Sequence, residues 1–288
     1  MAGQMWFGTR GYMQWVPAPA VDTDFSKVGW SSQMQYLNGG SGVRSSRGSH
    51  KEYNLTWNIA SRDALRPITD YSDGIYDSTD GINLIYFVDP MAADKNVAPQ
   101  LWASPAQAAA DGVELIPGQT AYLSATPVNS LGYPARSATF TANATSSSFW
   151  LPIPPGYTAW VGVHGSRTGT AGVQITPTSG LGTGTPVVPT MLAVTDSTLV
   201  NTSFDYGIQD GILVSLVYVG AASTNTVTLS GLVIQLLPTG ATPPTGGFIS
   251  GQGHSGVQFA EKPTQTPRSA VLDKVAMSAR LIETGSWI

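Results

Sequence analysis

No cysteine occurs in this chain of 288 residues, which excludes disulfide bonds and thiolate metal sites. Histidine is scarce, with His50, His164 and His254 far apart in the sequence. Charged residues make up 11% of the chain and its net charge is −4, so electrostatics predict no nucleic-acid or anionic-membrane partner. No apolar run approaches about 18 residues, and no basic segment followed by an apolar run begins the chain, so neither a membrane span nor a secretory signal is predicted.

Glycine and proline are abundant, at 32 and 20 residues, which is typical of many turns between short strands. Apolar residues make up 42% of the chain, enough for a large core. Apolar and polar side chains alternate through Tyr53, Leu55, Trp57 and Ile59, which predicts a strand with one buried face. A second strand is predicted over Ile82–Val88, where the apolar run is nearly continuous.

Helical signals are short. The segment Ser61–Arg66 precedes Pro67, which predicts that a helix stops there. Ser104 and Pro105, followed by Ala106–Ala110 and a glycine, predict about two turns of helix with an N-cap and a proline at the first position.

The middle of the chain predicts one strand after another. Alternation begins at Ala121 and again at Ala138, and the other predicted strands are Thr158–His164, Gly172–Thr176, Val200–Asp205, Ile212–Val219 and Val227–Leu237. In the last of these the apolar parity drifts after Gly231, as a β-bulge would cause. Short strands separated by Gly/Pro turns predict a β-sandwich. Their run resembles the jelly roll of carbohydrate-binding modules.

Charge is distributed unevenly along the chain. Only seven of the 32 charged residues lie between Leu101 and Gly240, and the other 25 lie in the two flanks. This shift predicts an all-β protein in which residues 1–100 and 241–288 form one β-sandwich module and residues 101–240 form an inserted jelly-roll-like sandwich.

Several sequence segments in the two flanks, taken in order, resemble minor tail proteins of actinobacterial siphophages. They are WFGTRGYMQWVPAP (Trp6–Pro19), GSHKEYNLTW (Gly48–Trp57), YFVDPMAADKNVAPQLWASP (Tyr86–Pro105), GGFISGQGHSGVQF (Gly246–Phe259) and ARLIETGSWI (Ala279–Ile288). The resemblance, in part to distal tail proteins, implies a tail-tip protein of the virion, made in the host bacterial cytoplasm. It also implies a cyclic homo-oligomer, a hexamer or alternatively a trimer, that contacts the tail tube, the tape-measure protein and other tail-tip proteins.

The sequence predicts no catalytic residue and no cofactor. Gly251, Gly253 and Gly256 have the spacing of a dinucleotide fingerprint, with Asp273 further on, but no helix signal follows them. The segment around His254 and Ser255 misses the nucleophile motif GxSxG. The alternative for this segment is a glycine-rich loop without chemical function that packs at a subunit contact.

Acidic residues gather once, at Asp70, Asp73, Asp77 and Asp80, where a bound cation and ordinary Asp-Gly turns remain alternatives. We predict no metal site there, because the spacing is not that of an EF-hand.

The candidate contact aromatics are Trp150 and Trp160, which alternation places opposite core-facing neighbours. If exposed they offer platforms for host-envelope glycans or a protein partner, which makes a receptor- or carbohydrate-binding adhesin the alternative function. If covered, they only pack.

The last ten residues, Ala279–Ile288, are too apolar for a frayed end. We therefore predict that they are ordered and pair as a strand with the N-terminal module.

Overall fold

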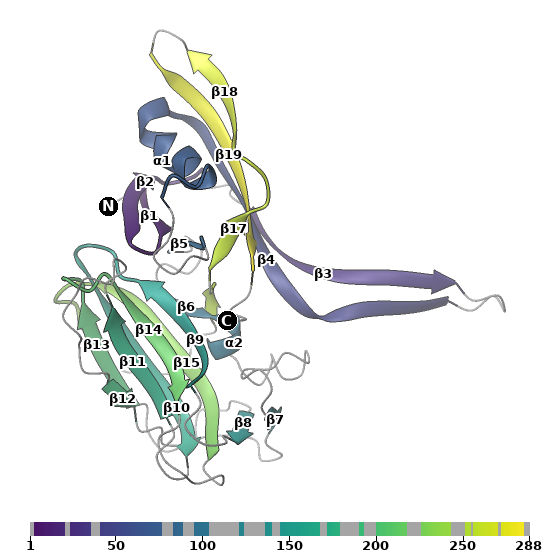
Figure 1. The fold of residues 1–288 in the computed structure, drawn as a ribbon, viewed down its shortest axis with the longest axis vertical. Helices are drawn as coiled ribbons and strands as arrows, with labels where there is room; N and C mark the ends of the chain where they lie inside the picture. The colour runs from purple at the N-terminus through teal and green to yellow at the C-terminus, as the bar shows by residue number, and fades with distance from the viewer. Residues whose placement is uncertain are drawn as a thin grey trace.

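The computed structural model describes residues 3–20, 24–35, 41–76, 83–88, 95–103, 121–123, 136–139, 145–167, 172–178, 190–192, 200–217, 226–242, 251–254, 256–269 and 272–284. Strands dominate, and they form a large sheet and a separate two-sheet sandwich, which lies below the large sheet in Figure 1. The predicted all-β sandwich class is therefore confirmed.

The large sheet is antiparallel and mixes strands from both ends of the chain. Its order is β2-β1-β5-β17-β19-β4-β3, and β18 pairs with β19. The strand bounds are β1 (Gln4–Thr9), β2 (Tyr12–Pro17), β3 (Asp24–Gln35), β4 (Ser41–Ser61), β5 (Ile85–Phe87), β17 (Val257–Phe259), β18 (Thr264–Ser269) and β19 (Lys274–Glu283). Its core is rich in aromatic residues, including Phe7, Tyr53, Trp57 and Phe87.

The C-terminal strand pairs with the N-terminal part of the chain, as predicted. In β19, Ala279 lies opposite Leu55 and Leu281 lies opposite Tyr53 on β4. All four side chains are buried. The prediction is confirmed for residues 279–283, and residues 285–288 lie outside the described part of the chain.

One alternation prediction is wrong. Tyr53, Leu55 and Trp57 are buried, but Ile59 is 71% exposed. The register between β19 and β4 shifts between the pairs Val275↔Ala60 and Met277↔Trp57, so β4 carries one extra residue there. A bulge of this kind reverses the side-chain parity, turning Ile59 outward and Ala60 toward the core.

The helix predicted to stop before Pro67 instead runs through it. Helix α1 spans Arg62–Ser72 with Pro67 inside. Leu65, Ile68 and Tyr71 lie on one buried face against the large sheet. Packing of this amphipathic face offsets the hydrogen bond that proline cannot donate.

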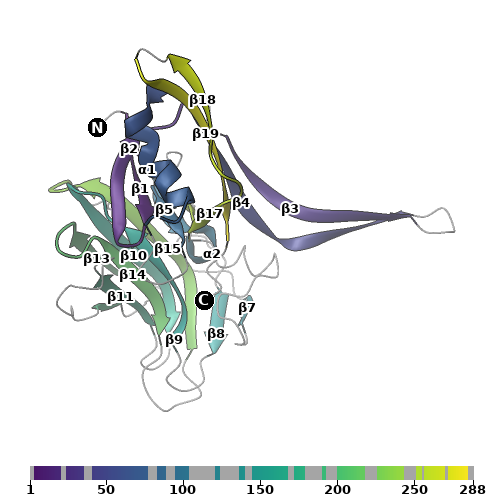
Figure 2. The same ribbon diagram turned by 45° about the horizontal axis from the view of Figure 1, so that its top comes forward.

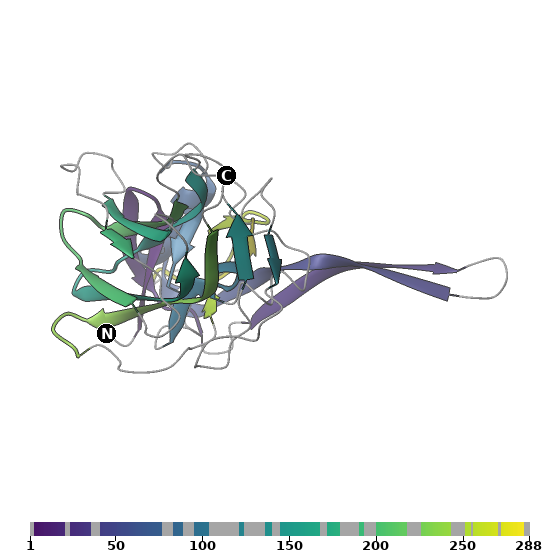
Figure 3. The ribbon, with the colours of Figure 1, turned by 90° about the horizontal axis from the view of Figure 1, so that it is seen from below.

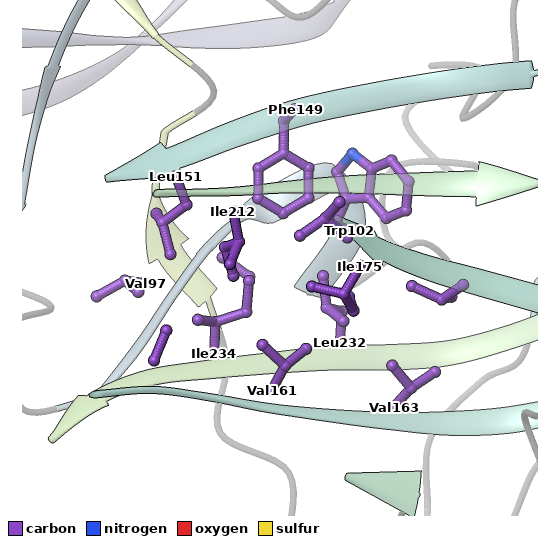
Figure 4. Packing of buried hydrophobic residues seen from close by; sticks show 14 of the residues in the cluster. Val97, Trp102, Phe149, Leu151, Val161, Val163, Ile175, Ile212, Leu232 and Ile234 are labelled. Carbon is purple, nitrogen blue, oxygen red and sulfur yellow. The ribbon is translucent and has the colours of Figure 1, made fainter. Parts of the chain in front are cut away.

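The sandwich contains two antiparallel sheets, and the predicted series of strands in the middle of the chain is present. One sheet has the order β13 (Val200–Asp205), β10 (Tyr157–Arg167), β15 (Thr226–Pro238), β8 (Arg136–Thr139), β7 (Ala121–Leu123). The other has the order β12 (Thr190–Leu192), β11 (Gly172–Thr178), β14 (Gly211–Val217), β9 (Thr145–Pro152). Figure 4 shows side chains from both sheets meeting in the core, among them Phe149, Val161 and Ile234.

The bulge predicted near Gly231 is confirmed. Gly231 lies opposite His164, whereas the next residue of β10, Gly165, lies opposite Leu229. Ser230 is therefore the extra residue. Leu229 on one side of the bulge and Leu232 on the other consequently both face the core, although their spacing is odd.

Two crossover segments connect the large sheet and the sandwich. They contain β6 (Asn96–Pro99), helix α2 (Gln100–Ala103) and β16 (Gly251–Gly253), and β6 pairs with β16 in parallel. Val97 and Ala98 already belong to the sandwich core, together with Trp102. The borders at residues 100 and 241 stay a prediction, as does the helix at Ala106–Ala110, which lies outside the described residues.

Candidate functional site

The most conspicuous surface feature is a two-stranded arm, formed by residues 27–35 of β3 and 41–51 of β4. It projects from the large sheet away from both cores, as all three ribbon views show (Figures 1, 2 and 3). The last pair that β4 makes with β19 joins Glu52 and Ile282. Beyond it, β4 pairs only with β3 among the described strands, from Lys27↔Lys51 to Gln35↔Ser41.

The arm is an unusual element for a chain that stands alone. A single hairpin is only marginally stable in water, because it has no second layer on which to bury a face. Among the described strands, residues 27–35 and 41–50 pair only with each other, and a strand edge without a partner strand can template pairing with another chain. No sequence motif predicted this arm, and it is the described element best suited to contact another protein.

The outer face of the sheet containing β10 carries the second candidate site. Ala159 and Val161 face the core, so Trp160 between them points outward. In register, Trp160 lies between Ser203 on β13 and Gln235 on β15. Ser203 is exposed, whereas Trp160 and Gln235 are buried, at 3% and 7% exposure. Within the described part of the chain, the Gln235 side-chain oxygen has no hydrogen-bond partner.

Trp150, the other predicted contact aromatic, is also covered. It points away from the core-facing Phe149 and Leu151, as the alternation predicted. Its exposure is only 2%, and its indole Nε1 donates to Thr178 Oγ1 at 3.1 Å. Neither tryptophan offers an exposed ring face, so the geometry favours packing over the platform role, and a contact with glycan or partner stays a prediction.

The glycine-rich segment does not have the context of a nucleotide-binding loop. Gly256 is followed directly by strand β17, not by a helix whose N-terminus could face a pyrophosphate. Gly253 lies so close to the Val97 carbonyl that a side chain there would clash. Asp273 forms an ion pair with Arg62, Nε to Oδ1 at 3.3 Å. Gly253 therefore serves close backbone packing, and Gly256 packs against the Leu84 and Tyr86 side chains.

His254 is held by backbone groups, and none of its hydrogen bonds within the described part of the chain joins it to a serine or another nucleophile. Its Nδ1 accepts from the Gly256 N–H at 3.2 Å, so Nε2 carries the proton and donates to the Phe87 carbonyl at 3.1 Å. Burial, followed by the nearby Lys51 charge, lowers the pKa of His254 to about 3. The Lys51 ammonium donates to the Gly253 carbonyl at 3.0 Å. His164 lies elsewhere, on β10 of the sandwich.

The acidic cluster is only partly described, because Asp77 and Asp80 lie outside the described residues. Asp70 pairs with Arg66 at 3.6 Å, and Asp73 pairs with Lys262 at 2.8 Å. Asp73 in turn raises the pKa of Lys262. Among the residues that the structure describes, no group of three or more His, Asp or Glu side chains gathers as a metal site would require.

No helix in the described part of the chain is long and apolar enough to cross a membrane.

Comparisons with known proteins add little. No family model matches the sequence, and no curated protein matches it. Two chains among the solved structures match. One is xylanase 10B of Clostridium thermocellum, comprising CBM22-1 and GH10 modules in complex with xylohexaose; the match has 9% identity and a TM-score of 0.27, and covers 45% of this chain and 26% of that chain.

Proposed function

We propose that this chain is a structural protein of a phage tail tip, which assembles as a closed ring and joins the tail tube to the host-adsorption apparatus. The arm formed by β3 and β4 is the observation that supports this role most directly. The resemblance of both flanks to minor tail proteins supports it independently. The partners proposed with it are the tail tube, the tape-measure protein and other tail-tip proteins, and no catalytic step is assigned to the chain.

An arm of this kind fits a head-to-tail contact. One protomer extends its hairpin over the next, so each interface uses two different surfaces of the same chain. Such heterologous interfaces close into a ring when the rotation between protomers is an exact fraction of a turn. A hexamer is the proposed ring, because the resemblance to distal tail proteins implies a six-fold partner tube, and a trimer is the alternative.

The arm can be removed without touching either core. Replacing residues 29–49 with Asn-Gly joins Val28 to His50, which are already paired, through a turn that suits a tight hairpin. The matched control replaces only residues 36–40 with Asn-Gly, which keeps every described pair of the arm. Light scattering after size exclusion should report a ring for the intact chain and the control, and a monomer for the armless chain. An armless chain that still forms the ring would contradict the proposal.

A carbohydrate-binding adhesin is the second candidate, favoured by the row of Ser203, Trp160 and Gln235 on the outer face of the sandwich. Hydroxyl groups beside an indole ring are usual partners of a sugar, and in this row Ser203 is the exposed residue, whereas Trp160 and Gln235 are buried. The test is binding of purified chain to host-envelope polysaccharide. Ser203→Ala should weaken it several-fold, and Thr266→Ala, exposed on β18, should not. The role would be excluded if the intact chain did not bind the polysaccharide, or if Ser203→Ala bound it as tightly as the intact chain.

A further inference from the structure

A third, small cluster of buried side chains lies between the large sheet and the sandwich. Its buried members are Leu84, Tyr86 and Trp150, with Met13 and Leu213 packed against them. Met13 and Tyr86 come from strands β2 and β5 of the large sheet, whereas Trp150 and Leu213 come from β9 and β14 of the sandwich. The cluster is therefore an interface between the two parts of the molecule, distinct from both large cores.

Trp150 lies at the centre of this interface and is held from several directions. Its ring meets Tyr86 edge-on, with centroids 4.8 Å apart and planes at 78°. The Arg10 guanidinium from the large-sheet side lies 5.8 Å from the ring centroid. Gly211 leaves space for the indole, because a side chain at that position would overlap it. The hydrogen bond to Thr178 fixes the rotation of the ring in the sandwich.

Strand β5 links this interface to the core of the large sheet. Ile85 and Phe87 face that core, whereas Leu84 and Tyr86 face Trp150. This explains why the segment is nearly continuous in apolar residues: both faces of the strand are buried. If the sandwich tilted relative to the large sheet, Trp150 would have to move away from Tyr86. Tyr86 itself is held in place by strand β5, which is buried on both faces.

Asn96 provides a second attachment, at the start of the crossover. Its Nδ2 donates to the Leu232 carbonyl at 2.9 Å, and its Oδ1 accepts from the Ile234 N–H at 2.9 Å. The side-chain amide thus takes the place of a neighbouring strand on the edge of β15, beyond the pairs that β8 makes with residues 226–229. Asn96 is fully buried, and β6, which contains it, also pairs with β16 of the returning segment.

We propose that the Trp150–Tyr86 contact, supported by Asn96, is a rigid joint that makes the large sheet and the sandwich unfold and move as one body. The sandwich is then held at a set angle to the large sheet. This inference goes beyond the proposed function and does not depend on ring formation. Because Trp150 belongs to neither large core, removing it should uncouple the two parts and leave each core intact.

The test compares Trp150→Ala with the intact chain by differential scanning calorimetry and small-angle X-ray scattering. The intact chain should unfold in one transition. The variant should unfold in two separate transitions, and its scattering should show a broader distribution of interatomic distances. The matched control is Trp160→Ala, which removes an equally buried tryptophan from the outer face of the other sheet; it should lower the single transition without splitting it.

Tyr86→Leu approaches the same contact from the large sheet and keeps the test decisive if Trp150→Ala fails to fold. It should also split the transition, because it removes the ring that meets the indole and keeps an apolar side chain in place. A single transition and unchanged scattering in Tyr86→Leu would overturn the proposal, whether or not Trp150→Ala folds. Splitting in Trp160→Ala as well would also overturn it, because the joint would then have no special role.

Discussion

At the scale of single residues, His254 illustrates how burial settles protonation. Both ring nitrogens are engaged by backbone groups, and the ring packs against Phe87 and Tyr53 at centroid distances of 4.4 and 5.6 Å. A second proton would have to sit on Nδ1, which already accepts from the Gly256 N–H. The folded chain therefore binds this proton far more weakly than the unfolded chain does.

This difference predicts a loss of stability in mild acid. The pKa of His254 is about 3 in the folded chain and 6.5 in the unfolded chain. The stability that neutral His254 contributes is therefore fully present above pH 6.5 and is lost progressively as the pH falls toward 3. The loss should approach about 1.4 kcal/mol per pH unit in that window. Urea unfolding at pH 7 and pH 5 measures it. His254→Gln keeps an acceptor and a donor but cannot titrate, so its stability should fall less between the two pH values; an equal fall would contradict the assignment.

The sequence pattern predicted which side chains share one face of a strand, but it did not predict which other residues cover that face. The opposition of Trp150 to Phe149 and Leu151 followed from strand alternation alone. Its burial did not, because Tyr86 and Arg10 are remote in sequence. The prediction that Ile59 is buried was wrong for a related reason. Ile59 points outward because of a bulge in the pairing of β4 with β19, and the local sequence pattern of β4 carries no sign of that bulge.

At the scale of elements, β19 holds the two ends of the chain together. It lies between β4 and β17, with Leu281 paired to Tyr53 on one side and Phe259 on the other. Leu281→Ala should lower the free energy of unfolding by about 2–5 kcal/mol, because the side chain is fully buried in a packed core. Denaturant unfolding measures this change.

The neighbouring Arg280 offers a matched control on the same strand. Its guanidinium forms a two-pronged contact with the Glu52 carboxylate, at 2.9 and 3.0 Å, on the solvent side of the sheet. Arg280→Ala should cost about 1–2 kcal/mol, less than Leu281→Ala, because the Arg280 side chain is 45% exposed although that of Glu52 is only 12% exposed. Equal losses for the two variants would show that β19 is not packed with Leu281 inward.

Elements were predictable where their own residues specify them. The strands of the sandwich and the bulge at Ser230 follow from apolar parity. Helix α1 was predicted too short, because local rules weigh Pro67 but not the burial of Ile68 and Tyr71 against a sheet built from both ends of the chain. The arm was missed altogether, because its strands carry no simple alternation of apolar and polar residues.

At the scale of the whole molecule, the domain borders near residues 100 and 241 stay a prediction, and the sandwich core reaches past the first of them. The sandwich core includes Val97 and Ala98, which precede the predicted border at residue 101. Composition could not reveal this, since two apolar residues before the border carry no charge signal. What assigns them to the sandwich is the crossover, where Asn96 occupies the edge of β15 and Trp102 packs on Phe149 at a centroid distance of 5.1 Å.

The packing of Val97 and Ala98 in the sandwich core predicts how isolated sandwich fragments behave. A fragment of residues 95–240 should be more stable than one of residues 101–240 by about 3–5 kcal/mol, since Val97 contributes about 1.5–3 kcal/mol by burial and each Asn96 hydrogen bond about 1 kcal/mol. Urea unfolding of the two fragments measures the difference. Asn96→Ala and Val97→Ala in the longer fragment should each remove part of it, which separates a specific attachment from a general effect of chain length. Equal stability of the two fragments would mean that β6 belongs energetically with the large sheet.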